Sequence, residues 1–376
     1  MKFLHLSDLH LGRRLCEMDL WEDQAYILRQ CLEMAKENQV TAVLIAGDVY
    51  DRSVPTVGAV NLLDQFLNDL VQAGIAAYII SGNHDSADRL GFGSKLLQSN
   101  RVYLASVFQD GLEHYTLQDE YGEVHLWALP FIRPSMVRGC FPEQEIANYT
   151  DAVAAIVQHA KIDPSARNIM MAHQFVTAGT QQPETCDSES LNLGTLDNVD
   201  ASVFDVFDYV ALGHIHGPQR VGRDTVRYCG SPLAYSVSEV RHTKGVVLVE
   251  LGAKGTLSWQ QLPLTPLRPL RRLEGPLEEL LAHGQPSDDY IYGVLTDDVP
   301  PMNAAVRLRS IYPYLVKLDF APRGTRTHQK RATIKEIDNK GLLELFDDFY
   351  QTVHERPLDE QERQVMHKVC EEVEQQ

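Results

Sequence analysis

The sequence predicts an α/β fold for residues 1 to about 265, because short apolar runs alternate there with amphipathic stretches. The apolar runs predict strands at Phe3–Leu6, Ala42–Ala46, Ala76–Ile80, Asn168–Ala172, Tyr209–Leu212, Thr225–Cys229 and Val246–Glu250. Apolar residues recur at helical spacing from Trp21 to Ala35 and from Val60 to Val71, so a helix is expected in each of the first two connections. The polar stretch from about 178 to 200 has no such period and predicts a surface loop.

A change of composition predicts two further parts of the chain. Pro263, Pro266 and Pro269 remove backbone donors within a few residues, which places the end of the first domain at 265. Residues 266–323 predict a small α+β capping domain with strands at Tyr290–Leu295 and Tyr314–Phe320 and a helix at Met302–Ile311. Residues 324–376 begin as a polar, basic connector and continue as two amphipathic patterns, which predict a helical tail.

Composition excludes several classes of protein. The 376 residues are 44% hydrophobic and 23% charged, and they contain no uninterrupted apolar run of about 20 residues, so a membrane protein is not expected. The first eight residues are too polar for a signal peptide, and we expect a cytoplasmic protein. The six cysteines form no Cys-x-x-Cys pair, which predicts reduced core thiols rather than disulfides or a zinc–thiolate site.

The formal net charge of −18 has the wrong sign for binding nucleic acid through bulk electrostatics. Much of the excess lies in the tail, where residues 332–376 hold twelve acidic and five basic side chains. An acidic site that collects divalent cations and a solubilising acidic surface are the two explanations for the rest.

Nearly every predicted strand of the first domain ends in an acid, an amide or an imidazole. These clusters are Asp8-Leu9-His10, Gly47-Asp48, Gly82-Asn83-His84-Asp85, His173 and Gly213-His214-Ile215-His216. Strand carboxyl ends are where α/β folds place ligand groups, and residues two apart point to the same side. Oxygen and imidazole donors without thiolates favour manganese, magnesium or iron over structural zinc.

The order Asp-x-His, Gly-Asp-x-x-Asp, Gly-Asn-His-Asp, His, Gly-His-x-His resembles the signature of the calcineurin-like metallophosphoesterases. That resemblance implies a four-layer α/β/β/α sandwich and two divalent metal ions, with Mn²⁺ expected and Mg²⁺ or Fe²⁺ as alternatives. It also implies the ligands: Asp8, His10 and His216 for the first ion, Asn83, His173 and His214 for the second, and Asp48 as the bridge between them, with one carboxylate oxygen toward each ion.

The resemblance further implies roles for two neighbouring residues and a mechanism. His84 would face the scissile phosphate, stabilise developing charge and protonate the leaving oxygen, while Asp85 would either orient the His84 ring or cap a turn. Two cations would activate a water for in-line attack, without a covalent enzyme intermediate. The sequence has no Gly-x-x-x-x-Gly-Lys-[Ser/Thr] loop, so ATP hydrolysis by this chain alone is not expected.

The sequence resembles two branches of this family. The run Gly47 to Arg52 is similar to that of serine/threonine protein phosphatases, in which the arginine binds phosphate, but Ser53 and Asp85 depart from that pattern. The runs Ser7 to Gly12, Gly213 to His216 and Tyr228-Cys229-Gly230-Ser231-Pro232 instead resemble the SbcD family of bacterial nuclease subunits. This second branch implies a manganese-dependent exonuclease on double-stranded DNA and endonuclease on single strands or hairpins, acting in repair, recombination and replication.

The SbcD resemblance also implies partners, namely DNA and the SMC-like ATPase SbcC, in a heterotetramer built on a homodimer of this chain. Arg13, Arg14 and Arg52 are candidate DNA contacts, with a solvated surface arginine as the alternative for each. The tail is the candidate docking element for SbcC, through apolar stripes that include Leu342, Phe346, Phe349, Val365 and Val369. Packing on the chain's own domain is the alternative for these stripes.

Two other functions stay open from the sequence. One is a phosphoesterase acting on phosphoproteins or small-molecule phosphoesters. The other is a non-catalytic scaffold, against which stands the presence of all seven implied metal ligands.

Overall fold

The computed structural model describes residues 1–189, 198–321, 350, 362, 363, 365 and 366. The chain divides into two compact units, residues 1–321 and 322–376. The described residues of the second unit are helical. Of the predicted docking residues, Leu342, Phe346, Phe349 and Val369 lie outside the described part, and Val365 is 62% exposed.

Two six-stranded sheets make up most of the first unit. The first has the order β16-β15-β1-β4-β5-β6, in which β1, β4, β5 and β6 run parallel and β15 and β16 are antiparallel additions. Its strands are β1 (Lys2–Leu6), β4 (Ala42–Ala46), β5 (Ala76–Ile80), β6 (Val102–Ala105), β15 (Gly245–Leu251) and β16 (Leu257–Pro263). The four predicted strands that fall in this sheet are confirmed within one residue at each end.

The second sheet also has four parallel strands and two antiparallel ones, but its antiparallel strands lie at opposite edges. Its order is β13-β14-β12-β9-β8-β7, with a parallel centre (β14, β12, β9, β8) and an antiparallel strand at each edge. Its strands are β7 (Glu113–Asp119), β8 (Gly122–Leu129), β9 (Arg167–His173), β12 (Tyr209–Gly213), β13 (Gln219–Val221) and β14 (Arg223–Tyr228).

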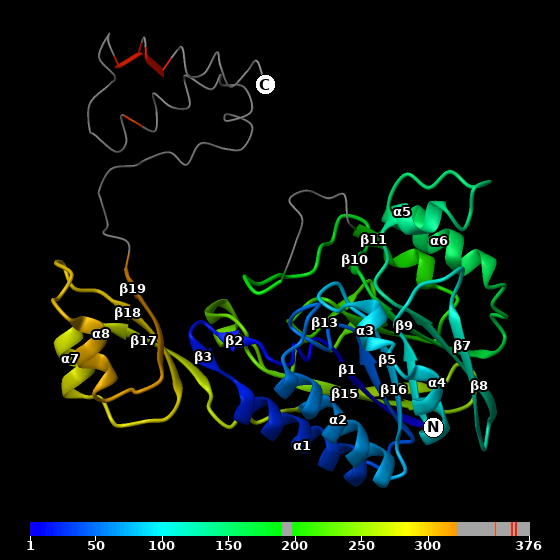
Figure 1. Ribbon diagram of the computed structural model, residues 1–376, viewed down its shortest axis with the longest axis horizontal. Helices are drawn as coiled ribbons and strands as arrows, with labels where there is room; N and C mark the ends of the chain where they lie inside the picture. Colours follow the sequence, from blue (N-terminus) through cyan, green and yellow to red (C-terminus); the bar gives the residue numbers. More distant parts are fainter. Residues whose placement is uncertain (190–197, 322–349, 351–361, 364, 367–376) are drawn as a thin grey trace. The chain divides into compact units, whose positions relative to one another are not determined.

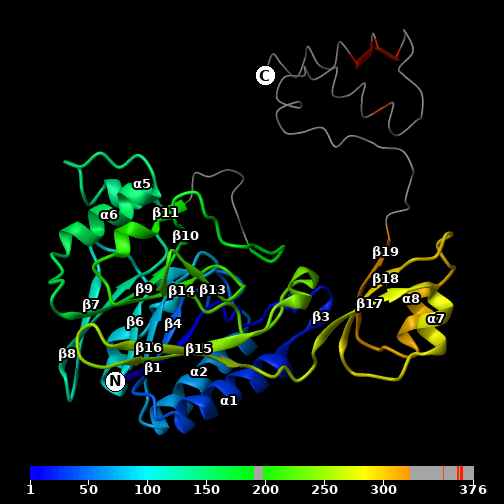
Figure 2. The ribbon, with the colours of Figure 1, turned by 180° about the vertical axis from the view of Figure 1, so that it is seen from behind.

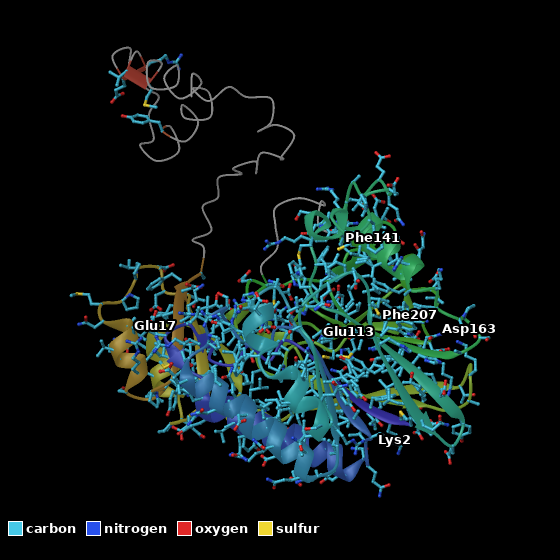
Figure 3. All side chains as sticks on the ribbon, turned by 45° about the vertical axis from the view of Figure 1, so that its right-hand side comes forward. Lys2, Glu17, Glu113, Phe141, Asp163 and Phe207 are labelled. Atoms are coloured by element: carbon cyan, nitrogen blue, oxygen red, sulfur yellow. The ribbon has the colours of Figure 1, made fainter. Side chains whose placement is uncertain are left out.

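Helices cover the outer faces of both sheets, so the layers run α/β/β/α, as the family resemblance implies (Figures 1 and 2). Helices α1 (Trp21–Glu37) and α2 (Val57–Gln72) pack on the first sheet through a core that includes Ile27 and Leu67. Helix α6 (Tyr149–His159) packs on the second sheet, in the core that holds Phe141 and Phe207 (Figure 3). A third core between the sheets consists of inward side chains from both.

Shorter elements connect the strands and helices of these two sheets. They are β2 (Arg14–Leu15), β3 (Met18–Asp19), α3 (Ala87–Leu90), α4 (Ser94–Leu97), η1 (Gln98–Asn100), α5 (Pro134–Arg138), β10 (Phe175–Thr177), β11 (Asn198–Asp200), η3 (Ala201–Phe204) and η4 (Val237–Arg241). The prediction of a surface loop at 178–200 is wrong for its last three residues, because they form β11, which pairs in parallel with β10. Within the described ranges, no helix is long and apolar enough to cross a membrane.

Residues 270–320 form a three-stranded sheet with its own core around Leu277, Leu295 and Leu308. The elements are β17 (Leu270–Gly275), α7 (Leu277–Ala282), β18 (Tyr290–Leu295), α8 (Ala304–Arg309) and β19 (Leu315–Phe320). All three strands run parallel with a helix in each crossover, so this is an α/β unit rather than the predicted α+β unit.

A buried carboxylate joins this small sheet to α1. Asp23 is 1% exposed and accepts hydrogen bonds from Arg268 Nη1 at 2.7 Å and from the Tyr290 hydroxyl at 2.8 Å. Arg268 therefore bridges two parts of the protein.

The thiols agree with the sequence prediction only in part. Five cysteines lie in the described residues and all are unpaired. Cys31 and Cys229 are core residues as expected, whereas Cys16 is exposed. Cys370 lies outside the described residues.

Candidate metal centre

The predicted ligands come together where the carboxyl ends of strands from the two sheets meet. Asp8, Asp48 and Asn83 follow β1, β4 and β5 of the first sheet, while His173 ends β9 and His214 follows β12 of the second. Hydrogen bonds join the loops across the sheets: the backbone N–H of His214 donates to Asp8 Oδ1 at 3.0 Å. The site therefore depends on both sheets being in place.

Four of the ligand residues have an unusual backbone conformation. The φ angles of Asp8, His10, Asp48 and His214 are 53°, 41°, 47° and 111°. Positive φ is unfavourable for residues with a side chain, but it reverses the chain directly after a strand. The backbone hydrogen bonds from Asp8 to Gly47 and from His10 to Asp48 hold two of these turns in place.

The first ligand group is Asp8, His10 and His216, whose ligand atoms all lie within 4.8 Å of one another. The Nε2 atoms of His10 and His216 face each other at 3.1 Å. All three residues are at most 1% exposed. Two imidazole nitrogens and a carboxylate converging in a buried space form a donor set for a divalent cation.

The second ligand group is Asn83, His173 and His214. The side-chain oxygen of Asn83 lies 3.1 Å from His173 Nε2 and 2.9 Å from His214 Nδ1. On its other side the His173 ring donates from Nδ1 to the carbonyl of Ala46 at 2.8 Å, because a carbonyl can only accept. The Nε2 atom of His173 therefore points at the Asn83 oxygen.

Asp48 lies between the two groups. Its Oδ2 is 3.6 Å from His10 Nε2 in the first group and 3.4 Å from His173 Nε2 in the second. Its Oδ1 accepts a hydrogen bond from the backbone N–H of His84 at 2.9 Å. The prediction that each carboxylate oxygen faces one cation differs from this arrangement, because the structure directs Oδ2 toward both groups.

Electrostatics support the same donor set. Burial lowers the pKa of His214 to about 3 and that of His10 well below its ordinary value, so both rings are neutral and carry a lone pair. Burial also lowers the pKa of His173, but the facing Asp48 outweighs burial and raises it to about 9. Burial alone would raise the pKa of Asp48, yet His173 and His10 hold it well below the usual range.

These residues fit a pair of divalent cations. A proton on His173 satisfies Asp48 and Asn83 when no cation is bound, so positive charge is stabilised at this position. In the first group, Nδ1 of His10 is buried with no hydrogen-bond partner, while its Nε2 faces a second ring nitrogen. A cation held by the facing nitrogens and carboxylates would relieve the contact between the Nε2 atoms of His10 and His216 and would replace the proton on His173.

His84 and Asp85 take different positions beside the centre. The His84 ring donates from Nδ1 to the carbonyl of Asp51 at 3.0 Å and stands edge-on to His10, with 4.8 Å between ring centroids. The Asp85 carboxylate accepts the backbone N–H groups of Val49, Tyr50 and Gly82 at 2.9 to 3.1 Å. Asp85 therefore holds two loops, which favours the capping alternative, and the Asp51 carbonyl orients the His84 ring.

The three predicted DNA-contacting arginines differ in surroundings. Arg13 pairs with Asp51 at 3.1 Å and donates to the Ser188 carbonyl at 2.9 Å, with its side chain 17% exposed. Arg14 forms an exposed pair with Asp19, and Arg52 is 77% exposed beside Asp51. Arg13 is thus fixed next to the centre, whereas Arg14 and Arg52 are surface side chains.

The run from Tyr228 to Pro232 braces three of the ligand loops. The Tyr228 hydroxyl donates to the carbonyl of Gln174, the residue after His173, at 2.8 Å. Cys229 Sγ lies 3.1 Å from the hydroxyl of Ser7, the residue before Asp8, and the Ser231 backbone N–H donates to the His216 carbonyl at 3.2 Å. A Cβ on Gly230 would lie 2.6 Å from that same carbonyl, so only glycine fits.

Sequence reasoning missed several residues that hold the site. Gln24 on α1 donates to the carbonyl of His10 at 2.8 Å and accepts from the backbone N–H of Gly12 at 3.0 Å. Glu189 accepts the backbone N–H of His216 at 2.7 Å, from a segment that the sequence predicts as a surface loop. No local pattern marks these residues, because their role depends on contacts distant in sequence.

Known proteins match this chain over most of its length. The model of the calcineurin-like phosphoesterase family matches residues 1–218, and the model described as the type 5 capsule protein repressor C-terminal domain matches residues 266–354. The chain is 33% identical over 353 residues to the SbcD subunit of the nuclease SbcCD of Staphylococcus epidermidis, covering 92% of each chain. Among solved structures, a dimetal phosphatase from Danio rerio matches with a TM-score of 0.40 and 13% identity, over 70% of this chain and 98% of that chain. By its matching family model and its identity to this curated relative, the chain belongs to the calcineurin-like phosphoesterase family and, within it, to the SbcD group.

Proposed function

We propose that this protein is the nuclease subunit of an SbcCD-type complex and hydrolyses DNA phosphodiesters at the site between its two sheets. The observation that supports the proposal is the position of Asp48 Oδ2, which faces an imidazole of each ligand group at 3.6 and 3.4 Å. Two divalent cations, Mn²⁺ in our proposal with Mg²⁺ or Fe²⁺ as alternatives, would supply the Lewis acidity that activates water and offsets phosphate charge.

The protein's own residues would then divide the work. Asp8, His10 and His216 would hold one cation, Asn83, His173 and His214 the other, and Asp48 would contact both. His84, with its ring fixed by the Asp51 carbonyl, would stabilise charge on the phosphate and donate a proton to the leaving oxygen. Arg13, held beside the centre by Asp51, is the arginine best placed to contact a DNA phosphate.

The substrate class is tested with three substrates offered to the purified chain in Mn²⁺: a labelled DNA duplex, a phosphopeptide and a cyclic nucleotide. We expect cleavage of the DNA and no turnover of the other two. A circular single-stranded DNA in the same buffer separates endonuclease from exonuclease activity, because only an endonuclease can open it. Turnover of the phosphopeptide alone would instead establish the protein phosphatase alternative.

We also propose that DNA cleavage takes place in a heterotetramer of two copies of this chain and two SbcC ATPase subunits, in the cytoplasm, during DNA repair, recombination and replication. The small sheet of residues 270–320 is the proposed second DNA-contacting part. Three of its arginines sit in partly exposed ion pairs that phosphates could replace: Arg271 with Asp289, Arg272 with Glu274 and Arg307 with Glu278.

The helical tail is the proposed SbcC docking element. Phe349→Glu is expected to abolish capture of SbcC while leaving Mn²⁺-dependent cleavage of short single-stranded DNA near the wild-type rate, because an unpaired carboxylate in an apolar contact costs several kcal/mol by order of magnitude. Pull-down and nuclease assays on one preparation measure both. Glu362→Gln serves as a polar control in the tail. If SbcC still binds Phe349→Glu with unchanged affinity, the docking assignment is wrong.

A further inference from the structure

A chain of buried polar groups lies behind His216, on the side away from the other ligands. Ser188 Oγ is 2.8 Å from His216 Nδ1 and 2.6 Å from Glu239 Oε1. The other oxygen of Glu239 contacts Lys244 Nζ at 2.5 Å. Ser188, Glu239 and Lys244 are 6%, 1% and 9% exposed. None of these three residues belongs to the ligand set.

The donors and acceptors that these hydrogen-bonded side chains offer fix the direction of each hydrogen bond. Glu239 is paired with the Lys244 ammonium, so it is a carboxylate and can only accept. The single hydroxyl proton of Ser188 is therefore donated to Glu239. The Ser188 oxygen can then only accept from His216, which places the proton of a neutral His216 ring on Nδ1 and leaves the Nε2 lone pair facing His10.

Lys244 contacts both ends of this series of polar groups, Glu239 and His216. Its ammonium also donates to the His216 carbonyl at 3.0 Å and to the Ser231 hydroxyl at 2.8 Å. The ring and the backbone of His216 are thus held by connected groups. Lys244 also makes the nearby Cys186, His216 and Glu239 group a poor additional cation site, because its positive charge already neutralises Glu239.

We propose that Ser188 is a positioning residue, which relays the charge of Glu239 to His216 and holds that ring in the tautomer that binds metal through Nε2. Groups of this kind behind a ligating histidine typically strengthen metal binding by about 10–100-fold. The inference rests on the proposed function in one respect, the assignment of His216 as a metal ligand. It goes beyond that function because it gives Ser188, which lies in the segment predicted as a surface loop, a role at the metal centre.

The test compares Ser188→Ala with Ser238→Ala by calorimetric titration of Mn²⁺ into the full-length protein. Ser238 accepts the backbone N–H of Asp187 at 3.0 Å, so the control removes a hydroxyl that holds the same loop without touching His216. We expect Ser188→Ala to bind at least one Mn²⁺ about 10–100-fold more weakly than the wild type, and Ser238→Ala to stay within about twofold. Equal affinity of Ser188→Ala and wild type, or equal weakening in both variants, would overturn the proposal.

A second readout needs no metal. In ¹⁵N-histidine-labelled, metal-free protein, long-range ¹H–¹⁵N spectra at pH 8 should show His216 as the Nδ1–H tautomer, and Ser188→Ala should populate the Nε2–H form. An unchanged tautomer in Ser188→Ala contradicts the proposal. Absence of Mn²⁺ binding by the wild type would instead count against the proposed function, and the spectra would still decide whether Ser188 sets the His216 tautomer.

Discussion

The His84→Gln variant is expected to bind as much metal as the wild type and to cleave DNA about 10²–10⁴-fold more slowly. The reason is that the His84 ring is oriented by the Asp51 carbonyl through Nδ1, whereas the seven proposed ligands already complete the two groups around Asp48. Glutamine keeps a polar side chain but cannot transfer a proton. Metal analysis of the purified variant and single-turnover cleavage in excess Mn²⁺ measure the two quantities separately.

The same variant tests whether His84 is itself a metal ligand, because one of its ring nitrogens lies within 4.8 Å of ligand atoms of His10 and Asp48. Loss of a metal equivalent in His84→Gln would show that His84 is a ligand rather than a group that acts on phosphate. A normal cleavage rate would remove it from the mechanism altogether. His114→Gln is the matched control, since His114 lies on the edge strand β7 beside His125.

Asp48→Ala is expected to lose both metal equivalents and all measurable cleavage. Its Oδ2 lies 3.6 Å from an imidazole nitrogen of the first ligand group and 3.4 Å from one of the second, and its charge is the main cause that raises the pKa of His173. Without it, the remaining donors of each group are two histidines with Asp8 or with Asn83. Metal content after dialysis and DNA cleavage at several Mn²⁺ concentrations test this expectation.

The control for this variant is Asp64→Ala on the exposed side of α2, which removes one negative charge outside the centre. It should retain wild-type metal content and rate. If high Mn²⁺ restores full cleavage to Asp48→Ala, Asp48 contributes affinity only and the shared role proposed for it is wrong. Circular dichroism melts of both variants separate loss of metal from loss of fold.

The parts of the fold that sequence predicts well are those buried on both faces. Strands β4 and β5 are buried at every position and read as continuous apolar runs. The edge strands β7 and β16 alternate between exposed and half-buried residues, and β17 does much the same, so no apolar run marks them. Helix α6 also has a local signal in the sequence, a capping box from Asn148 to Asp151 before apolar residues.

Some residues of the candidate site could likewise be predicted from the sequence, and others could not. The ligands could be predicted because each follows an apolar strand, and parallel strands place their carboxyl ends at one edge. Asp85 could not be assigned, because whether a carboxylate caps a loop or orients a ring depends on which atoms surround it after folding. Ser188 and Gln24 were missed for the same reason: their partners, His216 and the carbonyl of His10, are brought to them only by the packing of distant segments.

The left-handed backbone of Asp8, His10, Asp48 and His214 has a consequence for how this protein tolerates change. Each such residue costs on the order of 1–3 kcal/mol relative to glycine, which adopts positive φ without strain. Backbone strain and metal ligation therefore pull in opposite directions at the same four positions. A search for stabilised variants that considered backbone strain alone would favour glycine there and discard the ligands, so these positions have to be held fixed in any stabilised form of the protein.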